Sequence, residues 1–364
     1  MKIRRVAILG AGNGGITAAA DLKIRGFEVS LFELPKFGKT IDLIRQSGQL
    51  TLKSDEGTTQ VKIDLLTTDI AEAVKGAQVV MLTIPINYIE DFARVCAPVI
   101  NTDQIVLIHT AACMGAARFI NTARKMGINR EYKIGELNTL AYGTRAFPDT
   151  GEIKLWLRVR HLYFAAYPSR HTTELIGPCQ QIYDCIVPAE NMWEVALTNG
   201  NPEPHCISLF NAGRIEYSKG DFYLYKEGIT PHTVNIIHQV CKERLALGKA
   251  LGFELDDALV ARLKRGYFSE GPGSLDVKFN TSPIFPNVKG PESLESRYFT
   301  EDMANGLALY VSLGKALNVP TPASESIVIL GGFLLQRDFM SESVTLEELG
   351  FGGLDAKGLN EAVA

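Results

Sequence analysis

The sequence predicts an α/β fold, in which a doubly wound, mostly parallel sheet is followed by an all-helical C-terminal domain. Three observations predict it. Short apolar runs alternate with helical segments over the first half of the 364 residues. A glycine-rich turn follows the first apolar run, and helical spacing replaces the strand pattern from about Glu190 onward. This length allows about two domains, and we expect them at residues 1–190 and 191–364.

The first half follows a strand–helix alternation in chain order. Val6–Leu9 is a strand, the helix after the glycine-rich turn reaches about Arg25, and Glu28–Phe32 is the second strand. Two alternating runs within Gln49–Ile63 predict a hairpin insertion. The later strands are Gln78–Ile84, Gln104–His109, Tyr132–Leu137 and a strand pattern over Lys154–Ala166, and the helices are Phe37–Gly48, Tyr88–Ile100 and Met114–Met126. Such alternation implies right-handed crossovers between parallel strands.

Helical periodicity defines the second half. The expected helices are Ile207–Tyr217, Thr233–Leu251, Asp256–Arg265 and Thr300–Leu317. The stretch Gly271–Pro291 is rich in Pro and Gly, and we expect a long loop there.

Composition excludes several classes of protein. The chain is 46% hydrophobic and 21% charged, so it can bury a sizeable core. Its net charge of −4 gives no general drive toward nucleic acid or an anionic membrane, and no apolar run approaches the roughly 20 residues of a membrane span. The six cysteines are dispersed without a CxxC pair, which is typical of a reducing compartment. We therefore expect a cytoplasmic protein.

The glycine-rich turn has the spacing Gly10-x-Gly12-x-x-Gly15, between a strand and a helix. The first glycine permits the tight turn, the second lets a pyrophosphate approach the backbone, and the third lets helix and strand pack closely. With Asn13 and Gly14, these residues form the helix N-terminus that would receive the phosphates. The pattern predicts a Rossmann-type dinucleotide site; a glycine-rich turn without a ligand is the alternative.

A carboxylate at the end of the second strand bears on which dinucleotide binds. Glu33 is placed to accept hydrogen bonds from the ribose hydroxyls and to repel a 2′-phosphate, which favours NAD. NADP is the alternative, because Lys36 and Lys39 lie nearby, and Glu33 could also make a purely structural contact. Thr83 and Pro85, at the end of a later strand, are expected on the nicotinamide side.

A nicotinamide cofactor implies hydride chemistry, which calls for a proton donor and acceptor. None of the six histidines has the HxxxH or HExxH spacing, so we expect no metal site. His205 follows Pro204 at the predicted start of a helix, where it is a candidate general acid and base. Its alternative role is that of an ordinary structural histidine.

Two segments of the second half carry a family resemblance. Asn201–Glu216 (NPEPHCISLFNAGRIE) resembles the segment that opens the C-terminal domain of the octopine/nopaline (opine) dehydrogenases. Ser296–Leu307 (SRYFTEDMANGL) is similar to a second family stretch, and Val319–Pro322 also fits. Cys206 stands where the family usually has Pro, and we expect it to be a small buried filler. With the glycine-rich turn, the likeness covers most of the chain.

The resemblance implies an NADH-dependent reductive condensation of an amino acid with a 2-oxo acid such as pyruvate, giving an N-(carboxyalkyl)amino acid, and the reverse oxidation. It implies that His205 is the acid and base, that Asp302 is its carboxylate partner, and that Arg297 binds a substrate carboxylate. It further suggests that Thr139 contacts the amino acid, and that Glu136 and Arg145 pair. Without the family, Asp302 would be an ordinary first-turn acid.

Two other functions stay open at this point. One is an NAD(P)-dependent reductase of a 2-oxo acid or polyol that needs no amine cosubstrate. The other is a non-enzymatic protein that binds NAD and responds to it. For the protein itself we expect small-molecule substrates, an amino acid and a 2-oxo acid, no nucleic-acid or membrane partner, and a monomer or homodimer.

Overall fold

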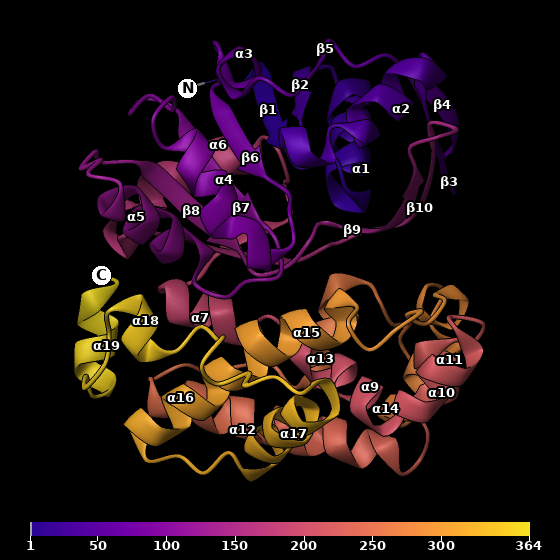
Figure 1. Cartoon of the computed structure of the whole chain (residues 1–364), viewed down its shortest axis with the longest axis vertical. Coiled ribbons are helices and arrows are strands. Elements are labelled where there is room, and N and C mark those ends of the chain that lie inside the picture. The colour runs from indigo at the N-terminus through magenta and orange to yellow at the C-terminus, as the bar shows by residue number, and fades with distance from the viewer. Residues whose placement is uncertain (1) are drawn as a thin grey trace. The chain divides into compact units, whose positions relative to one another are not determined.

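Strands and helices alternate in the first part of the chain, and helices alone make up the second (Figure 1). The computed structural model describes residues 2–364. Contacts along the chain divide it into two compact units, one ending at Val195 and the other beginning at Ala196. Within the described residues, no strand follows β12 (Ile186–Pro188).

The first unit is built on an eight-stranded sheet with the order β12-β11-β8-β7-β6-β1-β2-β5. Its other strands are β1 (Arg5–Leu9), β2 (Glu28–Phe32), β5 (Leu65–Thr67), β6 (Val79–Leu82), β7 (Ile105–His109), β8 (Lys133–Leu137) and β11 (Leu162–Ala166). Every pair is parallel except β8 with β11. All residues of β6 and β7 are buried, which explains their unbroken apolar sequences. The predicted doubly wound, mostly parallel sheet is confirmed.

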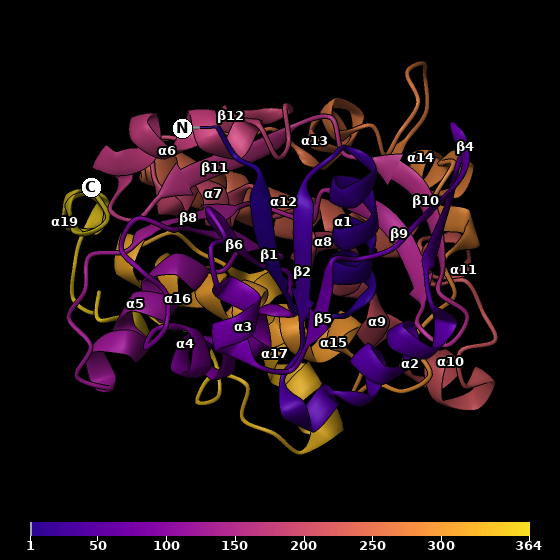
Figure 2. The same cartoon turned by 90° about the horizontal axis from the view of Figure 1, so that it is seen from above.

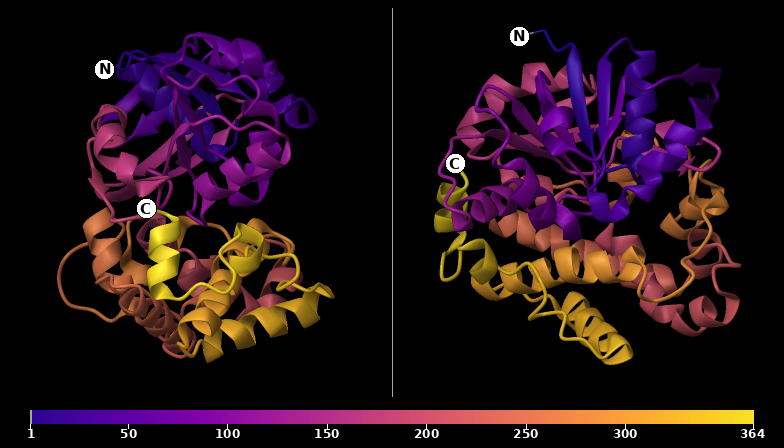
Figure 3. Two further views of the ribbon diagram at one scale, coloured as in Figure 1. Left: turned by 90° about the vertical axis from the view of Figure 1, so that its left-hand side faces the viewer. Right: turned by 45° about the horizontal axis from the view of Figure 1, so that its top comes forward.

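Helices connect these strands (Figure 2; Figure 3, right). They are α1 (Asn13–Ile24), α2 (Lys39–Ser47), α3 (Ile70–Val74), α4 (Ile89–Cys96), α5 (Gly115–Lys125) and α6 (Thr172–Gln180), while α7 (Met192–Leu197) follows the last strand, β12. Helix α1 lies beside β1 and β2, and α4 packs on α5. The carboxyl ends of the central strands therefore meet the glycine-rich turn, which lies between β1 and α1.

A second, four-stranded sheet with the order β4-β3-β10-β9 packs on α1. Its strands are β3 (Leu50–Ser54), β4 (Gly57–Val61), β9 (Tyr142–Phe147) and β10 (Glu152–Arg158). The hairpin expected within Gln49–Ile63 is confirmed by the antiparallel pairing of β3 with β4. The strand pattern over Lys154–Ala166 is divided between β10 and β11, which belong to different sheets. Alternation along one segment does not reveal its partner strand, so this division was not predictable.

The second unit is helical throughout its described residues. Its helices are α8 (Pro202–His205), α9 (Ile207–Phe210), α10 (Ala212–Ser218), α11 (Leu224–Gly228), α12 (Thr233–Ala250), α13 (Ala258–Arg265), α14 (Leu275–Thr281), α15 (Arg297–Asp302), α16 (Ala308–Leu317), α17 (Pro322–Leu335), α18 (Leu346–Leu349) and α19 (Ala356–Ala362). The left panel of Figure 3 shows them from the side. The helices expected at Thr233–Leu251 and Asp256–Arg265 are confirmed.

Three expectations for this unit need correction. The helix expected over Ile207–Tyr217 is split into α9 and α10 at Asn211. The expected loop Gly271–Pro291 contains α14, because Leu275 and Phe279 are buried on one face of a helical turn. The helix expected over Thr300–Leu317 begins earlier, at Arg297, and is interrupted by a π-helical turn at Met303–Leu307.

Candidate functional site

The glycine-rich turn has the close packing that its three glycines predict. A Cβ on Gly10, whose φ is +104°, would lie 2.5 Å from the carbonyl oxygen of Thr83. A Cβ on Gly15 would lie 1.7 Å from the carbonyl oxygen of Gly10. No atom lies within 4 Å of the corresponding position on Gly12. Two glycines therefore serve packing, and the middle one faces open space where a pyrophosphate fits.

Helix α1 begins at this turn without a side-chain cap and without an acidic residue in its first turn. Its first N–H groups and positive dipole end are thus suited to phosphate oxygens. The side chain of Asn13 has another use, because its Oδ1 accepts the N–H of Ala146 in β9 at 2.9 Å. A Cβ on Gly14 would lie 2.7 Å from the side chain of Leu140. The backbone N–H groups of Asn13 and Gly14 are thus the groups best placed to meet the phosphates of a cofactor.

Glu33 lies at the end of β2, next to the glycine-rich turn. Its Oε2 accepts the N–H of Ala11 and its Oε1 accepts the N–H of Leu34, each at 2.8 Å. Burial raises the pKa of the carboxyl, although these hydrogen bonds oppose the rise. Each oxygen keeps a second lone pair for a ribose hydroxyl. Lys36, which together with Lys39 kept NADP open as the alternative, forms an exposed ion pair with Asp91 at 2.6 Å.

The strand ends near the expected nicotinamide side bring together Thr83 and His109. Thr83 is buried, and its hydroxyl lies 3.4 Å from Nδ1 of His109. Pro85 is exposed and precedes a short 3₁₀ turn, residues 86–88. The Nε2 of His109 accepts the N–H of Ala141 at 2.8 Å, and burial lowers the pKa of His109 to about 3. His109 is therefore a neutral, structural histidine.

Thr139 is buried just beyond the end of β8. Near it, the carboxylate of Glu136 accepts the N–H groups of Cys113 and Ala116, both at 3.1 Å. Glu136 therefore caps the start of α5, and the expected pairing with the exposed Arg145 is wrong. Burial raises the pKa of Glu136 to about 7, against the effect of these hydrogen bonds.

The second unit brings His205 and Asp302 into direct contact, although they are 97 residues apart in sequence. Nδ1 of His205 lies 2.6 Å from Oδ2 of Asp302, and both residues are buried. Nε2 of His205 lies 2.7 Å from the hydroxyl of Tyr225, and the ring of Tyr298 meets the imidazole edge-on at 4.8 Å. Because a carboxylate only accepts hydrogen bonds, Nδ1 carries a proton and donates it to Asp302.

Two features of the backbone bring the helix of His205 next to the helix of Asp302. His205 ends α8, whose first residue is Pro202, and Asp302 ends α15, directly before the π-helical turn. A Cβ on Gly306, within that turn, would lie 2.4 Å from the ring of Pro202. Only glycine allows the turn to pack so closely on α8. Such π-helical interruptions are frequent at functional sites.

A buried ion cluster anchors α8 from the other side. The carboxylate of Glu203 is fully buried and lies 2.7 Å from Nε of Arg244 and 3.1 Å from a guanidinium nitrogen of Arg262. Arg244 belongs to α12 and Arg262 to α13. Burial alone would raise the pKa of Glu203, but the two arginines hold it below its ordinary value. The cluster thus fixes the turn that presents His205.

Arg297 begins α15, with its side chain 53% exposed. Its guanidinium lies 3.3 Å from the carboxylate of Glu301 and 5.3 Å from the ring centre of Tyr298. Tyr298 in turn contacts His205. Arg297 therefore presents a half-exposed guanidinium, paired with Glu301, on the same helix as Asp302. A guanidinium fork is well matched to a substrate carboxylate.

The remaining candidates have structural roles or none. Within residues 2–364, no group of three His, Cys, Asp or Glu side chains is placed to hold a metal ion. The thiol of Cys206 is buried and donates to the carbonyl of Glu203, and burial raises the pKa of this thiol. Cys206 is thus the buried filler that was expected. No helix in this described range is long and apolar enough to cross a membrane.

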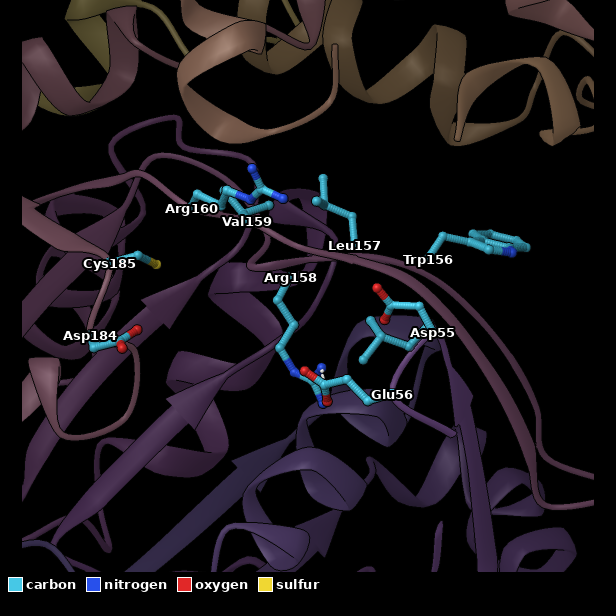
Figure 4. A pocket seen from close by; sticks show the side chains of 10 residues that line it. Asp55, Glu56, Trp156, Leu157, Arg158, Val159, Arg160, Asp184 and Cys185 are labelled. Atoms are coloured by element: carbon cyan, nitrogen blue, oxygen red, sulfur yellow. Dashed lines mark hydrogen bonds and ion pairs between the residues drawn. The ribbon is translucent and has the colours of Figure 1, made fainter. Parts of the chain in front are cut away.

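A cavity of about 540 Å³ lies elsewhere on the first unit (Figure 4). Its lining residues are Asp55, Glu56, Leu155, Trp156, Leu157, Arg158, Val159, Arg160, Asp184 and Cys185. Arg158 points to Glu56 at 2.9 Å and also binds the buried Asp21 at 2.9 Å. The charges of Arg158 are therefore satisfied within the protein. None of the predicted site residues lines this cavity, so its size does not make it the reactive site.

Sequence reasoning missed Tyr225 and the partners of Glu203. Tyr225 belongs to α11, in a region without a motif, and its contact with His205 depends wholly on the fold. Glu203 offered only a weak signal, since an acid in the first turn of a helix needs a cation only when it is buried. Which arginines would supply it could not be read from spacing.

A dinucleotide-binding sheet together with a helical unit that carries a buried histidine–aspartate pair defines a nicotinamide-dependent dehydrogenase. The helical domain of "NAD/NADP octopine/nopaline dehydrogenase" matches residues 188–335, and the N-terminus of "NAD-dependent glycerol-3-phosphate dehydrogenase" matches residues 5–122. The chain is 31% identical over 358 residues to the opine dehydrogenase of Arthrobacter sp. (strain 1C), covering 98% of each chain. The chain therefore belongs to the opine dehydrogenase family, whose members are NAD(P)-dependent oxidoreductases acting on CH–NH groups.

Solved structures of related enzymes share the fold. Octopine dehydrogenase in complex with NADH and agmatine superimposes with a TM-score of 0.76 at 16% identity, covering 98% of this chain and 97% of that one. Yersinopine dehydrogenase with NADP⁺ bound gives a TM-score of 0.72 at 16% identity, covering 100% and 98%. The family resemblance seen in the sequence is confirmed.

Proposed function

We propose that this protein catalyses the NADH-dependent condensation of an amino acid with a 2-oxo acid, with pyruvate as the first candidate, and the reverse oxidation. The observation that carries the proposal is the buried contact of His205 with Asp302, on a helix that begins with the half-exposed Arg297. The octopine dehydrogenase structures bind L-arginine, agmatine and pyruvate, which are the two substrate classes that this reaction joins.

The two units divide the work. We assign dinucleotide binding to residues 1–190 and substrate binding and catalysis to residues 191–364. The open space at Gly12 and the uncapped start of α1 would receive the pyrophosphate, and the remaining lone pairs of Glu33 would receive the ribose hydroxyls. NADH, when bound, supplies the hydride that reduces the imine carbon. The carboxylate of Glu33 at the end of β2 favours NAD over NADP, which stays the alternative because Lys36, in an exposed pair with Asp91, and Lys39 lie nearby.

His205 would move the proton that the condensation requires. The carboxylate of Asp302 holds Nδ1 protonated and stabilises the ring when it gains a second proton. Arg297 would bind a substrate carboxylate and so fix the orientation of the carbon to be reduced. We assign Thr139 to the amino-acid side, and Thr83 and Pro85 to the nicotinamide side. Positioning of both substrates would supply much of the rate enhancement.

One assay separates this function from its alternatives. NADH oxidation is followed with pyruvate alone and then with each of the twenty amino acids. We expect turnover that depends on the amine and a product that contains both substrates by mass spectrometry. Turnover with a 2-oxo acid or polyol alone would identify the simpler reductase, and NADH binding without any turnover would identify a non-enzymatic binding protein.

A variant tests the role of His205. His205→Asn should lower kcat by about 10²–10⁴-fold, the usual contribution of a general acid or base, while the Kd for NADH stays unchanged. His238→Asn, an exposed position on α12, is the matched control. Near-normal turnover in the His205 variant would refute the assignment.

We further propose a cytoplasmic location and a monomer or homodimer. The six cysteines are all free in the structure, which suits a reducing compartment. Light scattering on the purified protein would measure the oligomeric state, and fractionation would test the location.

A further inference from the structure

The imidazole of His205 has no ring nitrogen left for direct contact with a substrate. Nδ1 faces Asp302 at 2.6 Å, and Nε2 faces the hydroxyl of Tyr225 at 2.7 Å. Because Nδ1 carries the proton in the neutral ring, Nε2 offers a lone pair, and the Tyr225 hydroxyl donates to it. A proton that reaches or leaves His205 must therefore either pass through Tyr225 or wait for Tyr225 to move.

The surroundings of Tyr225 oppose such a movement. Tyr225 as a whole is 5% exposed. It is stacked on Phe279, with ring centres 5.9 Å apart and planes 7° apart, and it also packs on Phe285 at 4.7 Å. Swinging the ring away would break a buried hydrogen bond and both aromatic contacts together. The ring of His205 is held with equal firmness, by Asp302 and by the edge-on contact with Tyr298.

One charged group near Tyr225 is suited to binding a substrate. Burial raises the pKa of Tyr225 well above its ordinary value, and Arg297 is among the charged groups near enough to act on it. A substrate whose carboxylate is bound by Arg297 would thus place its reacting carbon in the neighbourhood of this hydroxyl. The phenol remains protonated at neutral pH, which suits a group that accepts one proton while it gives another.

We propose that Tyr225 is a catalytic residue that relays the proton between His205 and the substrate oxygen; this inference rests on the proposed condensation. In the dehydration step, the lone pair of the carbinolamine nitrogen forms the C=N bond as the C–O bond breaks, which gives an iminium ion that keeps its N–H. Protonated His205 passes the Nε2 proton to the oxygen of Tyr225, while Tyr225 passes its own proton to the departing hydroxyl, which leaves as water. Tyr225 is neutral before and after. The one proton that His205 gives up leaves in the water, and the positive charge passes from the imidazolium of His205 to the iminium ion.

The competing interpretation is that Tyr225 only occupies Nε2 until a substrate displaces it. The two interpretations predict opposite effects of removing the hydroxyl. If Tyr225 relays the proton, removing its hydroxyl slows the reaction. If Tyr225 only occupies Nε2, removing the hydroxyl leaves that nitrogen open to the substrate, so that kcat/KM is kept or raised.

Tyr225→Phe tests the relay, because it keeps the stacked ring and removes only the hydroxyl. We expect kcat to fall by about 10²-fold, with the KM values for NADH and the amino acid within a few-fold of wild type. Tyr267→Phe is the matched control. Tyr267 stacks on Phe285 in the same aromatic cluster. It does not bind His205, because Asp302 and Tyr225 occupy the two ring nitrogens of that histidine. Unchanged or increased kcat/KM in Tyr225→Phe would overturn the proposal.

A second measurement needs no variant. If two protons move together in the dehydration step, the proton inventory of the wild-type enzyme in H₂O–D₂O mixtures is curved under conditions where that step limits the rate. A linear inventory would overturn the relay even if Tyr225→Phe failed to fold. The underlying function is judged separately, by amine-dependent NADH oxidation in the wild type. If the wild type turns over and Tyr225→Phe matches it, only the relay fails.

Discussion

Replacing Glu203 with glutamine should strongly destabilise the helical unit. The carboxylate is completely buried and compensates the guanidinium groups of Arg244 and Arg262, which are themselves only 3% and 6% exposed. Removing one partner of a buried ion pair typically costs about 3–5 kcal/mol, because the remaining charge is left without compensation. For a unit of this size, each kcal/mol lowers Tm by about 2–4 °C, so we expect a fall of roughly 6–20 °C.

The assay is thermal and urea unfolding of the two proteins at neutral pH. Glu361→Gln is the matched control, since its 3.7 Å pair with Lys357 on α19 is highly exposed and such pairs contribute at most about 1 kcal/mol. A loss below about 1 kcal/mol in Glu203→Gln would refute the reasoning, because it would show that the two arginines find compensation elsewhere.

The pH dependence of the stability difference between wild type and Glu203→Gln tests whether Glu203 is ionised in the folded protein. The arginines lower the pKa of Glu203 in the folded state below its ordinary value of 4.5. The stabilisation from Glu203 is therefore present above that value and is lost as the pH falls through the lower, folded-state pKa. Wild type and Glu203→Gln should thus differ most at neutral pH and converge in acid. A constant difference down to low pH would contradict the assigned ionisation.

Three further predictions concern the first unit. Gly12→Ala should change the free energy of unfolding by less than about 1 kcal/mol. It should nevertheless weaken NADH binding at least about 10-fold in a fluorescence titration. Gly15→Ala should lower the free energy of unfolding by about 1–3 kcal/mol, because its Cβ would meet the Gly10 carbonyl. Equal behaviour of the two variants would contradict the packing argument. Glu33→Gln should lower the ratio of kcat/KM with NADH to kcat/KM with NADPH. An unchanged ratio would show that Glu33 does not bind the ribose hydroxyls. Because burial raises the pKa of Glu136 from 4.5 to about 7, wild-type stability should fall as pH rises between these values; Glu136→Gln should flatten this slope, as unfolding curves at several pH values would show.

The first unit was predictable in outline because its signals are local. Buried parallel strands are continuous apolar runs, and the glycine spacing reports close backbone contacts within a short segment. The division of Lys154–Ala166 between two sheets was not predictable, because alternation is the same for any partner strand. The helix α14 was missed since Pro and Gly dominate its surroundings, while the burial of Leu275 and Phe279 that stabilises it depends on other helices.

The candidate site shows the same limit. Family resemblance placed His205, Asp302 and Arg297 among the functional residues, and their chemistry could be argued from residue type alone. The resemblance did not reveal Tyr225 on the second nitrogen of His205, nor did it show that the side chain of Asn13 holds β9. These are contacts between distant segments, and a single sequence carries no record of them.

The sequence by itself determined the doubly wound sheet, the dinucleotide turn and the helical second half, whereas the histidine–aspartate pair came from the family resemblance. Periodicity, turn chemistry and motif spacing act over a few residues, so they can be read in one dimension. Tertiary structure alone decided which groups share a proton with His205 and which charges compensate Glu203. Those interactions depend on distances of about 3 Å between helices that are remote in sequence, and only the packing of the helices sets such distances.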